Sequence, residues 1–309
     1  MFLKIAALAV AVVVVVAVAA SLTTVQTPSP SEVSAPVVDD WGRAVDVGKP
    51  PERIVSLLPS TTEILFAVGV GDRVVGVDRY SDFPPQVAEG IRDGRITVVG
   101  GIADPSIETV IALEPDLVLA GHKGIQDEVV NALESRGLTV VALDPSNVTQ
   151  LYDSILLVGK VTGNMQQAEF VVSNMKEKVQ SITGKTAGLP KVRVYYEVWN
   201  DPLMTVGPGT WIHDLIGIAG GENIFADSSA AYPQISSEAV VELNPDVIIL
   251  PTQHPMSLDD VGKRPAWSMV NAVKNGKVYT IDGDIISRPG PRIVEGLEQL
   301  ARLIHPDAF

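Results

Sequence analysis

The chemistry that this sequence offers most clearly lies in a repeated unit whose two copies each carry a glutamate near the start of a predicted helix. Residues 106–120 read SIETVIALEPDLVLA, and residues 236–250 read SSEAVVELNPDVIIL. Each copy predicts a serine-capped helix with Glu108 or Glu238 in its first turn, followed by a Pro-Asp turn and a buried strand. Serine caps and first-turn glutamates ordinarily only stabilise a helix start, by about 0.5–1 kcal/mol each. Two copies, however, place two carboxylates on one common face, where they suit docking onto arginines of a symmetric partner.

Most catalytic and metal-binding patterns are missing from the sequence. It has no cysteine, which excludes disulfides, thiolate metal sites, a cysteine nucleophile and a cysteine-linked lipid. Residues 184–186, GKT, resemble the end of a phosphate loop, but Val179 stands where that loop needs glycine. No two histidines have the i, i+4 spacing of a zinc site, and the four are His122, His213, His254 and His305. We therefore expect no catalytic residue, no bound metal and no cofactor.

Composition and charge exclude further classes of protein. The 309 residues include 23 Lys plus Arg and 37 Asp plus Glu, for a formal charge of −14. This acidity, without a basic cluster, argues against a nucleic-acid partner. With 46% hydrophobic and 19% charged residues, the chain is expected to fold around a large core. Its length suggests about two domains of ordinary size.

The N-terminal residues predict export from the cytoplasm. An apolar run over residues 5–22 follows a single early lysine. Residues 17–19 form an A-x-A pattern that a signal peptidase cleaves, yet the run is also long enough to span a bilayer. Residues 1–22 are thus interpreted as a signal peptide or as an N-terminal membrane anchor. The Thr/Pro/Ser-rich residues 23–40 predict a semi-extended linker, with folded material starting near Trp41 outside the membrane.

Strands and helices alternate on both sides of a purely helical stretch. Residues 41–146 and 189–309 alternate short apolar runs with helical patterns, which predicts parallel sheets covered by helices. Residues 147–188 show helical periodicity, broken only near Gly163. The expected fold class is α/β, with two Rossmann-like lobes joined by a long connecting α-helix. The expected strands are 53–58, 73–77, 116–120, 139–143, 192–199, 247–250 and 278–281.

The expected helices fill the intervals between those strands. The first follows Pro59, and we expect the hydroxyl groups of residues 60–62 to cap it. The others are 104–113, 126–136, 210–219, 236–243 and 291–304.

Six segments resemble the substrate-binding proteins of cobalamin and iron-siderophore ABC importers, most of all the cobalamin-binding ones. They are RIVSLLPSTTEILFAVG (53–69), VVGVDRYSDFPPQV (74–87), IETVIALEPDLVLA (107–120), DPLMTVGPGTWIHDLIGIAGGENIF (201–225), YPQISSEAV (232–240) and SRPGPRI (287–293). The resemblance covers residues 50–305. It implies a receptor that captures cobalamin between its lobes and delivers it to an ABC permease with a cytoplasmic ATPase. In this family, glutamates at the positions of Glu108 and Glu238 pair with permease arginines.

The resemblance also implies a set of ligand-binding residues. Tyr80 and Tyr232 match positions where relatives carry aromatic residues that pack on the corrin, and flat rings bury much area at little entropic cost. Met204 matches a third aromatic position, which its flexible thioether is able to fill. Asp284 and Arg288 match a polar pair that relatives use on the side chains of the ligand. For each tyrosine the alternative is an ordinary half-buried core residue, and for Arg288 a surface salt bridge.

This chain departs from the cobalamin-binding pattern at two aromatic positions. Where the relatives place cleft tryptophans, it has Gly100-Gly101 and Gly121. Trp199 is a candidate substitute from another strand, and His122 is able to offer an axial nitrogen to a corrinoid cobalt. The thinner aromatic cage keeps a ferric siderophore or haem as alternative ligands. An exported enzyme on a two-lobed fold is a less favoured alternative, because the phosphate loop and cysteine chemistry are missing.

Overall fold

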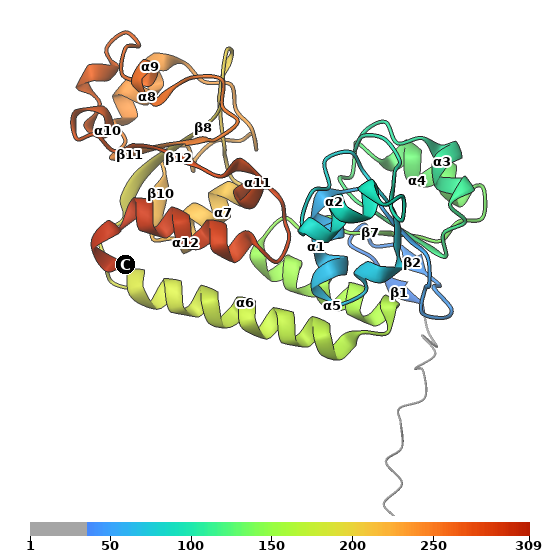
Figure 1. Ribbon diagram of the computed structural model, residues 1–309. Helices are drawn as coiled ribbons and strands as arrows, with labels where there is room; N and C mark the ends of the chain where they lie inside the picture. The colour runs from blue at the N-terminus through green and yellow to red at the C-terminus, as the bar shows by residue number, and fades with distance from the viewer. Residues whose placement is uncertain (1–35) are drawn as a thin grey trace, which may run out of the picture. The chain divides into compact units, whose positions relative to one another are not determined.

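The computed structural model describes residues 36–309, which Figure 1 colours from blue to red along the chain. The predictions for residues 1–22, and for most of the linker, lie outside the described residues. The fold begins at β1 (Val37–Val38), which pairs antiparallel with β2 (Ala44–Val45), so it starts earlier than expected. Buried Asp39 anchors this start, because its carboxylate accepts hydrogen bonds from the amides of Arg43 and Ala142 at 2.9 and 3.1 Å.

The first lobe contains a five-stranded sheet in the order β5-β4-β3-β6-β7, with every neighbouring pair parallel. Its strands are β3 (Ile54–Ser56), β4 (Val74–Val77), β5 (Thr97–Val98), β6 (Leu117–Ala120) and β7 (Val140–Ala142). Its helices are α1 (Pro59–Ala67), α2 (Pro85–Arg92), α3 (Ile107–Ala112) and α4 (Asp127–Glu134). The expected parallel α/β lobe is confirmed.

Both faces of this sheet are covered, which explains why its strands read as continuous apolar runs. Successive strand residues point to opposite faces. Ile54 and Leu117 belong to the core that includes α1 and the connector, whereas Val55 and Val118 pack with α3 and α4. A sheet buried on both sides leaves no polar alternation in the sequence.

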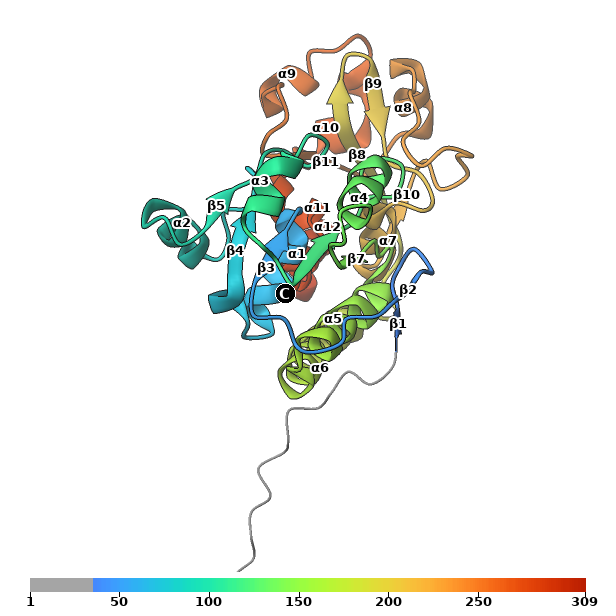
Figure 2. The same ribbon diagram turned by 90° about the vertical axis from the view of Figure 1, so that its right-hand side faces the viewer.

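The connector consists of two helices that pack against each other, α5 (Val148–Thr162) and α6 (Met165–Thr186). Gly163 ends α5 with φ of 76°, a left-handed conformation that glycine adopts readily. The predicted break is confirmed, and it reverses the chain direction rather than bending one long helix. Gly159 permits close packing of the pair, since a Cβ there would overlap that of Ala168. Figure 1 shows α6 running beneath both lobes, and Figure 2 shows α5 and α6 close together at the lower end of the ribbon.

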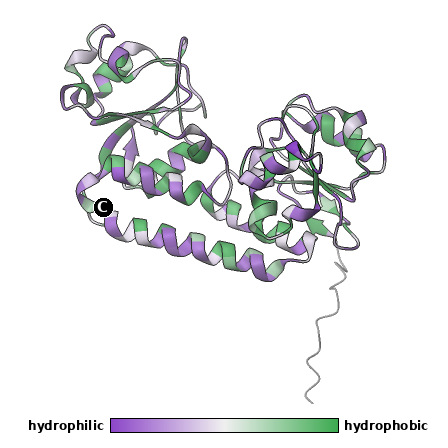
Figure 3. Cartoon of the chain, in the orientation of Figure 1, coloured by the Kyte–Doolittle hydropathy of each residue, from purple (hydrophilic) through white to green (hydrophobic). Residues whose placement is uncertain are grey.

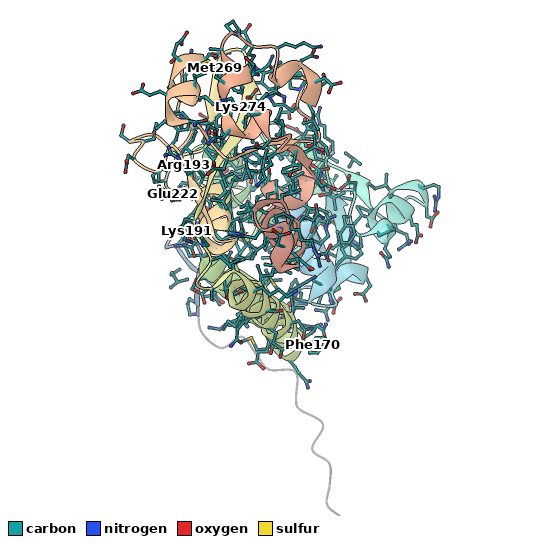
Figure 4. All side chains as sticks on the ribbon, turned by 90° about the vertical axis from the view of Figure 1, so that its left-hand side faces the viewer. Phe170, Lys191, Arg193, Glu222, Met269 and Lys274 are labelled. Atoms are coloured by element: carbon teal, nitrogen blue, oxygen red, sulfur yellow. The ribbon has the colours of Figure 1, made fainter. Side chains whose placement is uncertain are left out.

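The second lobe contains a sheet in the order β10-β8-β11-β12, with parallel neighbours, and β9 pairs antiparallel with β8. Its strands are β8 (Val192–Asn200), β9 (Leu203–Thr205), β10 (Gly221–Asn223), β11 (Val247–Pro251) and β12 (Val278–Ile281). Its helices are α7 (Trp211–Ile218), α8 (Ser237–Leu243), α9 (Leu258–Val261), α10 (Asn271–Lys274), α11 (Gly283–Ser287) and α12 (Ile293–Ile304). The parallel pairing sets Glu222 opposite Arg193, and Figure 4 labels both on the exposed side of this lobe.

Several elements were not expected from the sequence. The strands β1, β2, β5, β9 and β10 have two or three residues each, too few to show any periodicity. The eight-residue helix α2 was not expected either; it follows Pro84 and begins with Pro85. The last helix, α12, starts at Ile293 instead of residue 291, and the short helix α11 precedes it.

The two lobes share one hydrophobic core through the connector. A single cluster of buried residues includes Leu65 of the first lobe, Val172 of α6 and Leu297 of α12. Figure 3 shows apolar and polar residues alternating along α6 and α12, as expected for helices with one buried face. Within residues 36–309, no helix is both long enough and apolar enough to cross a membrane.

Candidate ligand-binding cleft

A cavity of about 250 Å³ opens between the lobes, and side chains of both lobes line it. Two of its walls come from the loops after β3 and β6, adjacent strands at which the chain order of the first sheet reverses. Ligands of open parallel sheets bind at this kind of position, beyond the carboxyl ends of the strands. The lining residues are Leu58, Ser60, His122, Leu143, Asp144, Pro145, Ser146, Gly209, Thr210, Trp211, Tyr232, Ser287 and Pro289.

Several polar groups face this cavity. The residue Ser60 is only 7% exposed, and its hydroxyl has no hydrogen-bond partner among the described residues. Nδ1 of His122 lies 3.9 Å from a carboxylate oxygen of Asp144. The indole of Trp211 donates a hydrogen bond of 2.8 Å to the carbonyl of Pro145, which ties α7 to the start of the connector. The cavity therefore combines aromatic surface with a few hydrogen-bonding groups, as small-molecule sites do.

The hydroxyl groups of residues 60–62 do not cap α1, which corrects the sequence-based expectation. Leu58 occupies the cap position without a side-chain hydrogen bond. The hydroxyl of Thr61 donates to the carbonyl of Leu58 at 2.9 Å, and that of Thr62 lies 2.8 Å from Ser56 Oγ. Thr61 and Thr62 therefore bind α1 to β3, while Ser60 is left facing the cavity.

The structure places one of the four predicted packing residues, three aromatic residues and one methionine, in the cavity lining. Tyr232 lines the cavity and is 55% exposed. Trp199 and Met204 face each other across the β8–β9 hairpin, and Met204 also pairs with Gln234, close to Tyr232 in the chain. Tyr80 follows β4 in the first lobe and is 52% exposed. Of these four, only Tyr232 belongs to the cavity lining as it stands.

Arg288 connects the two lobes. Its guanidinium lies 2.6 Å from a carboxylate oxygen of Asp82 in the first lobe, and 3.1 Å from one of Asp284 on α11. Glu63 lies further away, at 3.9 Å. The predicted polar pair, Asp284 and Arg288, is thus in contact, and Arg288 also forms an ion pair across the cleft. It sits between Ser287 and Pro289, both of which line the cavity.

A second ion pair between the lobes was missed by sequence reasoning. Nε and Nη2 of Arg292 lie 2.9 and 2.5 Å from the two carboxylate oxygens of Glu63, which is buried in α1. The guanidinium also stacks over Phe83, 3.8 Å from the ring centroid. Burial raises the pKa of Glu63, and the hydrogen bonds and charge of Arg292 oppose that shift. The one sequence signal was a carboxylate, Glu63, in the first turns of the helix that follows Pro59.

A further ion pair, which is buried, lies within the second lobe, outside the cavity lining. Both oxygens of Glu197 accept hydrogen bonds from Arg264, each at 2.6 Å. Nε2 of His254 lies 3.2 Å from the same carboxylate, and its side chain is 1% exposed. Burial lowers the pKa of His254. This cluster fastens the segment after β11 onto β8.

The two predicted docking carboxylates are exposed at the starts of their helices. Ser106 caps α3, where its Oγ accepts from the amide of Thr109 at 3.2 Å, and Ser236 caps α8 in the same way at Ala239. The predicted serine caps are confirmed. Glu108 and Glu238 lie in the first turns and are exposed. Figure 1 shows α3 and α8 at the ends of their lobes that point away from α6.

Sequence relatives are binding proteins of one family. A family model described as "Periplasmic binding protein" matches residues 54–285. An uncharacterized ABC transporter substrate-binding lipoprotein of Bacillus subtilis, YvrC, is 36% identical over 287 residues, which cover 90% of this chain and 88% of that protein. The vitamin B12-binding protein of Vibrio cholerae is 31% identical over 252 residues, 81% of this chain and 88% of that protein.

Solved structures share the arrangement. The crystal structure of the periplasmic vitamin B12 binding protein BtuF of Vibrio cholerae matches with a TM-score of 0.71 at 29% identity, over 83% of this chain and 98% of that one. The periplasmic heme-binding protein RhuT from Roseiflexus also matches with a TM-score of 0.71, over 84% and 99% of the two chains. Its identity of 24% shows a common fold only.

The family model, the sequence relatives and the similar two-lobed structure define a substrate-binding protein rather than an enzyme. The chain belongs to the periplasmic binding protein family, in the branch that serves ABC transporters. Such proteins act outside the cytoplasm and work with a permease and its ATPase. Membership of this family confirms the resemblance of the six segments to substrate-binding proteins of ABC importers.

Proposed function

We propose that this protein captures a corrinoid of the cobalamin type in the cleft between its lobes. The observation that carries the proposal is the likeness to vitamin B12-binding proteins over four fifths of the chain, at 31% identity. The cavity supports it, because Tyr232 offers a flat apolar surface and Ser60 a free hydroxyl for amide groups. The corrinoid is cargo on this proposal, and the protein has no resident cofactor.

Ligand binding is tested by titrating the full-length chain, purified in mild detergent, with cyanocobalamin while following tryptophan fluorescence. Parallel titrations use hemin and a ferric hydroxamate. We expect saturable quenching at one corrinoid per chain, weakened in Tyr232→Ala and unchanged in Tyr279→Ala, which is half-buried away from the cavity lining. Saturable binding of hemin or the hydroxamate alone would replace the corrinoid with that ligand. Haem is the second candidate, because an imidazole lines the cavity.

We further propose that Glu108 and Glu238 dock the loaded protein onto an ABC permease. Both carboxylates are exposed, and the serine caps fix their helices, so arginines of the permease would meet them in a defined geometry. In vesicles with the cognate permease and ATPase, Glu108→Ala with Glu238→Ala should abolish corrinoid uptake. Fluorescence titration of the same variant should give unchanged affinity. Loss of ligand binding with intact uptake would refute the assignment.

For the location, we propose that residues 5–22 export the chain and that the protein acts at the outer side of the membrane. The family supports an extracytoplasmic location. Whether the apolar segment is removed or retained as a tether is decided by the mass of the mature protein from membrane and soluble fractions. A protein that stays in the cytoplasm would refute the proposal.

A further inference from the structure

His122 stands in a loop that the surrounding structure holds in one conformation. Its φ is 50°, a left-handed value that is uncommon for a residue with a side chain. The carbonyl of His122 accepts hydrogen bonds from the amides of Ile125 and Gln126 at 2.9 and 3.1 Å. The buried side chain of Gln126 in turn accepts from the amide of Gly121 at 2.9 Å and donates to the carbonyl of Ile102 at 2.7 Å. The backbone that carries this imidazole is therefore fixed, and unusual conformations of this kind gather at functional sites.

The two ring nitrogens of His122 have different surroundings. Nδ1 faces the carboxylate of Asp144 at 3.9 Å, and that carboxylate is itself held by the amide of Lys123 at 3.0 Å. Nε2 makes no hydrogen bond within residues 36–309, and the side chain is 43% exposed on the cavity wall. A carboxylate near one nitrogen, with the other left open, resembles the arrangement that orients histidines toward metals, although here the 3.9 Å separation is longer than a hydrogen bond.

The other three imidazoles each have a neighbour inside the protein. Nδ1 of His213 lies 3.2 Å from the side-chain amide nitrogen of Asn223, and Nε2 of His305 lies 3.2 Å from the carbonyl oxygen of Gly220. His254 faces a buried carboxylate. None of the three lines the cavity between the lobes. The cavity thus has a single imidazole, and its available nitrogen is Nε2.

We propose that Nε2 of His122 is an axial ligand to the metal at the centre of a planar macrocyclic cargo, a corrinoid or a haem. This inference rests on the proposed function and deepens it. The step is a ligand exchange: the bond between the metal and an axial water breaks, a bond from the Nε2 lone pair forms, and the water leaves. The oxidation state of the metal does not change. Asp144 acts as a positioning residue that keeps Nε2 turned toward the cavity.

The same geometry restricts which cargo is bound through the metal. A macrocycle whose metal carries exchangeable water offers His122 a coordination position, whereas one with both axial positions occupied does not. The cavity of about 250 Å³ lies below the roughly 300–1,000 Å³ typical of small-molecule sites, so it encloses only part of a macrocycle. Coordination of the metal by His122 would then fix the orientation of the macrocycle, which the few aromatic residues around the cavity do not fix.

The test compares two cobalt corrinoids and one iron porphyrin on the full-length chain in detergent. Diaquocobinamide has exchangeable axial waters, cyanocobalamin has both axial positions filled, and hemin provides the iron counterpart. We expect the visible absorption bands of diaquocobinamide to shift on binding, and those of cyanocobalamin to stay unchanged. In the reduced Co(II) state, electron paramagnetic resonance should show a nitrogen triplet that becomes a doublet when histidine is labelled with ¹⁵N.

Three variants assign these signals to one side chain. His122→Asn should abolish the band shift and the nitrogen splitting, and asparagine tolerates positive φ, so the loop keeps its conformation. Asp144→Asn should weaken binding of diaquocobinamide by about tenfold or more, without weakening that of cyanocobalamin. Lys123→Ala is the matched control, because only its backbone amide contacts Asp144.

The outcomes separate this inference from the proposed function. If cyanocobalamin and diaquocobinamide both bind but no band shift occurs, or the shift survives in His122→Asn, axial ligation is refuted while corrinoid binding stands. If neither corrinoid binds but hemin shows a shift that His122→Asn removes, the axial ligand is upheld and the cargo is haem. If no macrocycle binds, both proposals fail. Circular dichroism of each variant shows whether a loss reflects unfolding.

Discussion

Replacing Arg292 by alanine should destabilise the protein by an amount that depends on pH. The substitution removes the cation from a pair in which the Glu63 side chain is 3% exposed and its oxygens lie 2.5 and 2.9 Å from the guanidinium. Glu63 is then left buried with Arg288 at 3.9 Å as its remaining cationic neighbour. A buried carboxylate without its partner takes up a proton, and the cost of doing so limits the penalty.

The size of this penalty follows from the proton equilibrium. Protonating a glutamate of ordinary pKa near 4.5 costs about 3.4 kcal/mol at pH 7 and about 1.4 kcal/mol at pH 5.5, at 1.36 kcal/mol per unit. Because burial already raises the pKa of Glu63 in the folded protein, the folded state binds more protons than the unfolded state. The contribution of this group to stability is therefore full at acid pH and is lost as the pH rises. We expect Arg292→Ala to cost about 3 kcal/mol at pH 7 and clearly less at pH 5.5.

Urea unfolding of the full-length chain at both pH values measures the effect. Arg302→Ala is the matched control, because Arg302 forms an exposed pair with Glu298 at 2.7 Å. Exposed pairs of this spacing contribute about 0.3–0.5 kcal/mol. Arg302 also lowers the pKa of Glu298, so the small penalty of the control should shrink as carboxylates protonate well below pH 5. A penalty for Arg292→Ala below about 1 kcal/mol at pH 7, or one that grows on acidification, would refute the reasoning.

Three further predictions concern packing and burial. Gly159→Val should separate α5 from α6 and cost about 1–3 kcal/mol in urea unfolding, because even a Cβ at this position overlaps Ala168; a neutral effect would contradict the close contact. His254→Asn should reduce the loss of folding stability that occurs below about pH 6.5, since burial lowers the pKa of His254 and protonation then favours the unfolded state. If the free energy of unfolding depended on pH in the same way with and without the substitution, this prediction would be wrong. Trp211→Phe should cost about 1 kcal/mol by removing the hydrogen bond to Pro145, and a cost near zero would indicate that water replaces it.

The sequence predicted the parts of the fold that depend on neighbouring residues. Strands such as β6 and β11 are continuous apolar runs, and the serine caps at Ser106 and Ser236 act on amides three residues away. The break at Gly163 was also local, because glycine adopts a left-handed conformation readily. The short strands β5, β9 and β10 were not predictable, since pairing with a distant strand defines them rather than their own composition.

The candidate site also has features that the sequence predicted and features that it did not. By itself, the sequence determined the family, the two-lobed α/β class, and Tyr232 and His122 as residues worth testing. Only the tertiary structure decided which side chains meet: Tyr232 and His122 line one cavity, whereas Glu63 and Arg292, 229 residues apart, form a buried ion pair between the lobes. The physical reason is that burying a charge is tolerable only when an opposite charge lies against it. Whether a distant residue arrives there depends on how the lobes pack, and no local pattern in the chain encodes that contact.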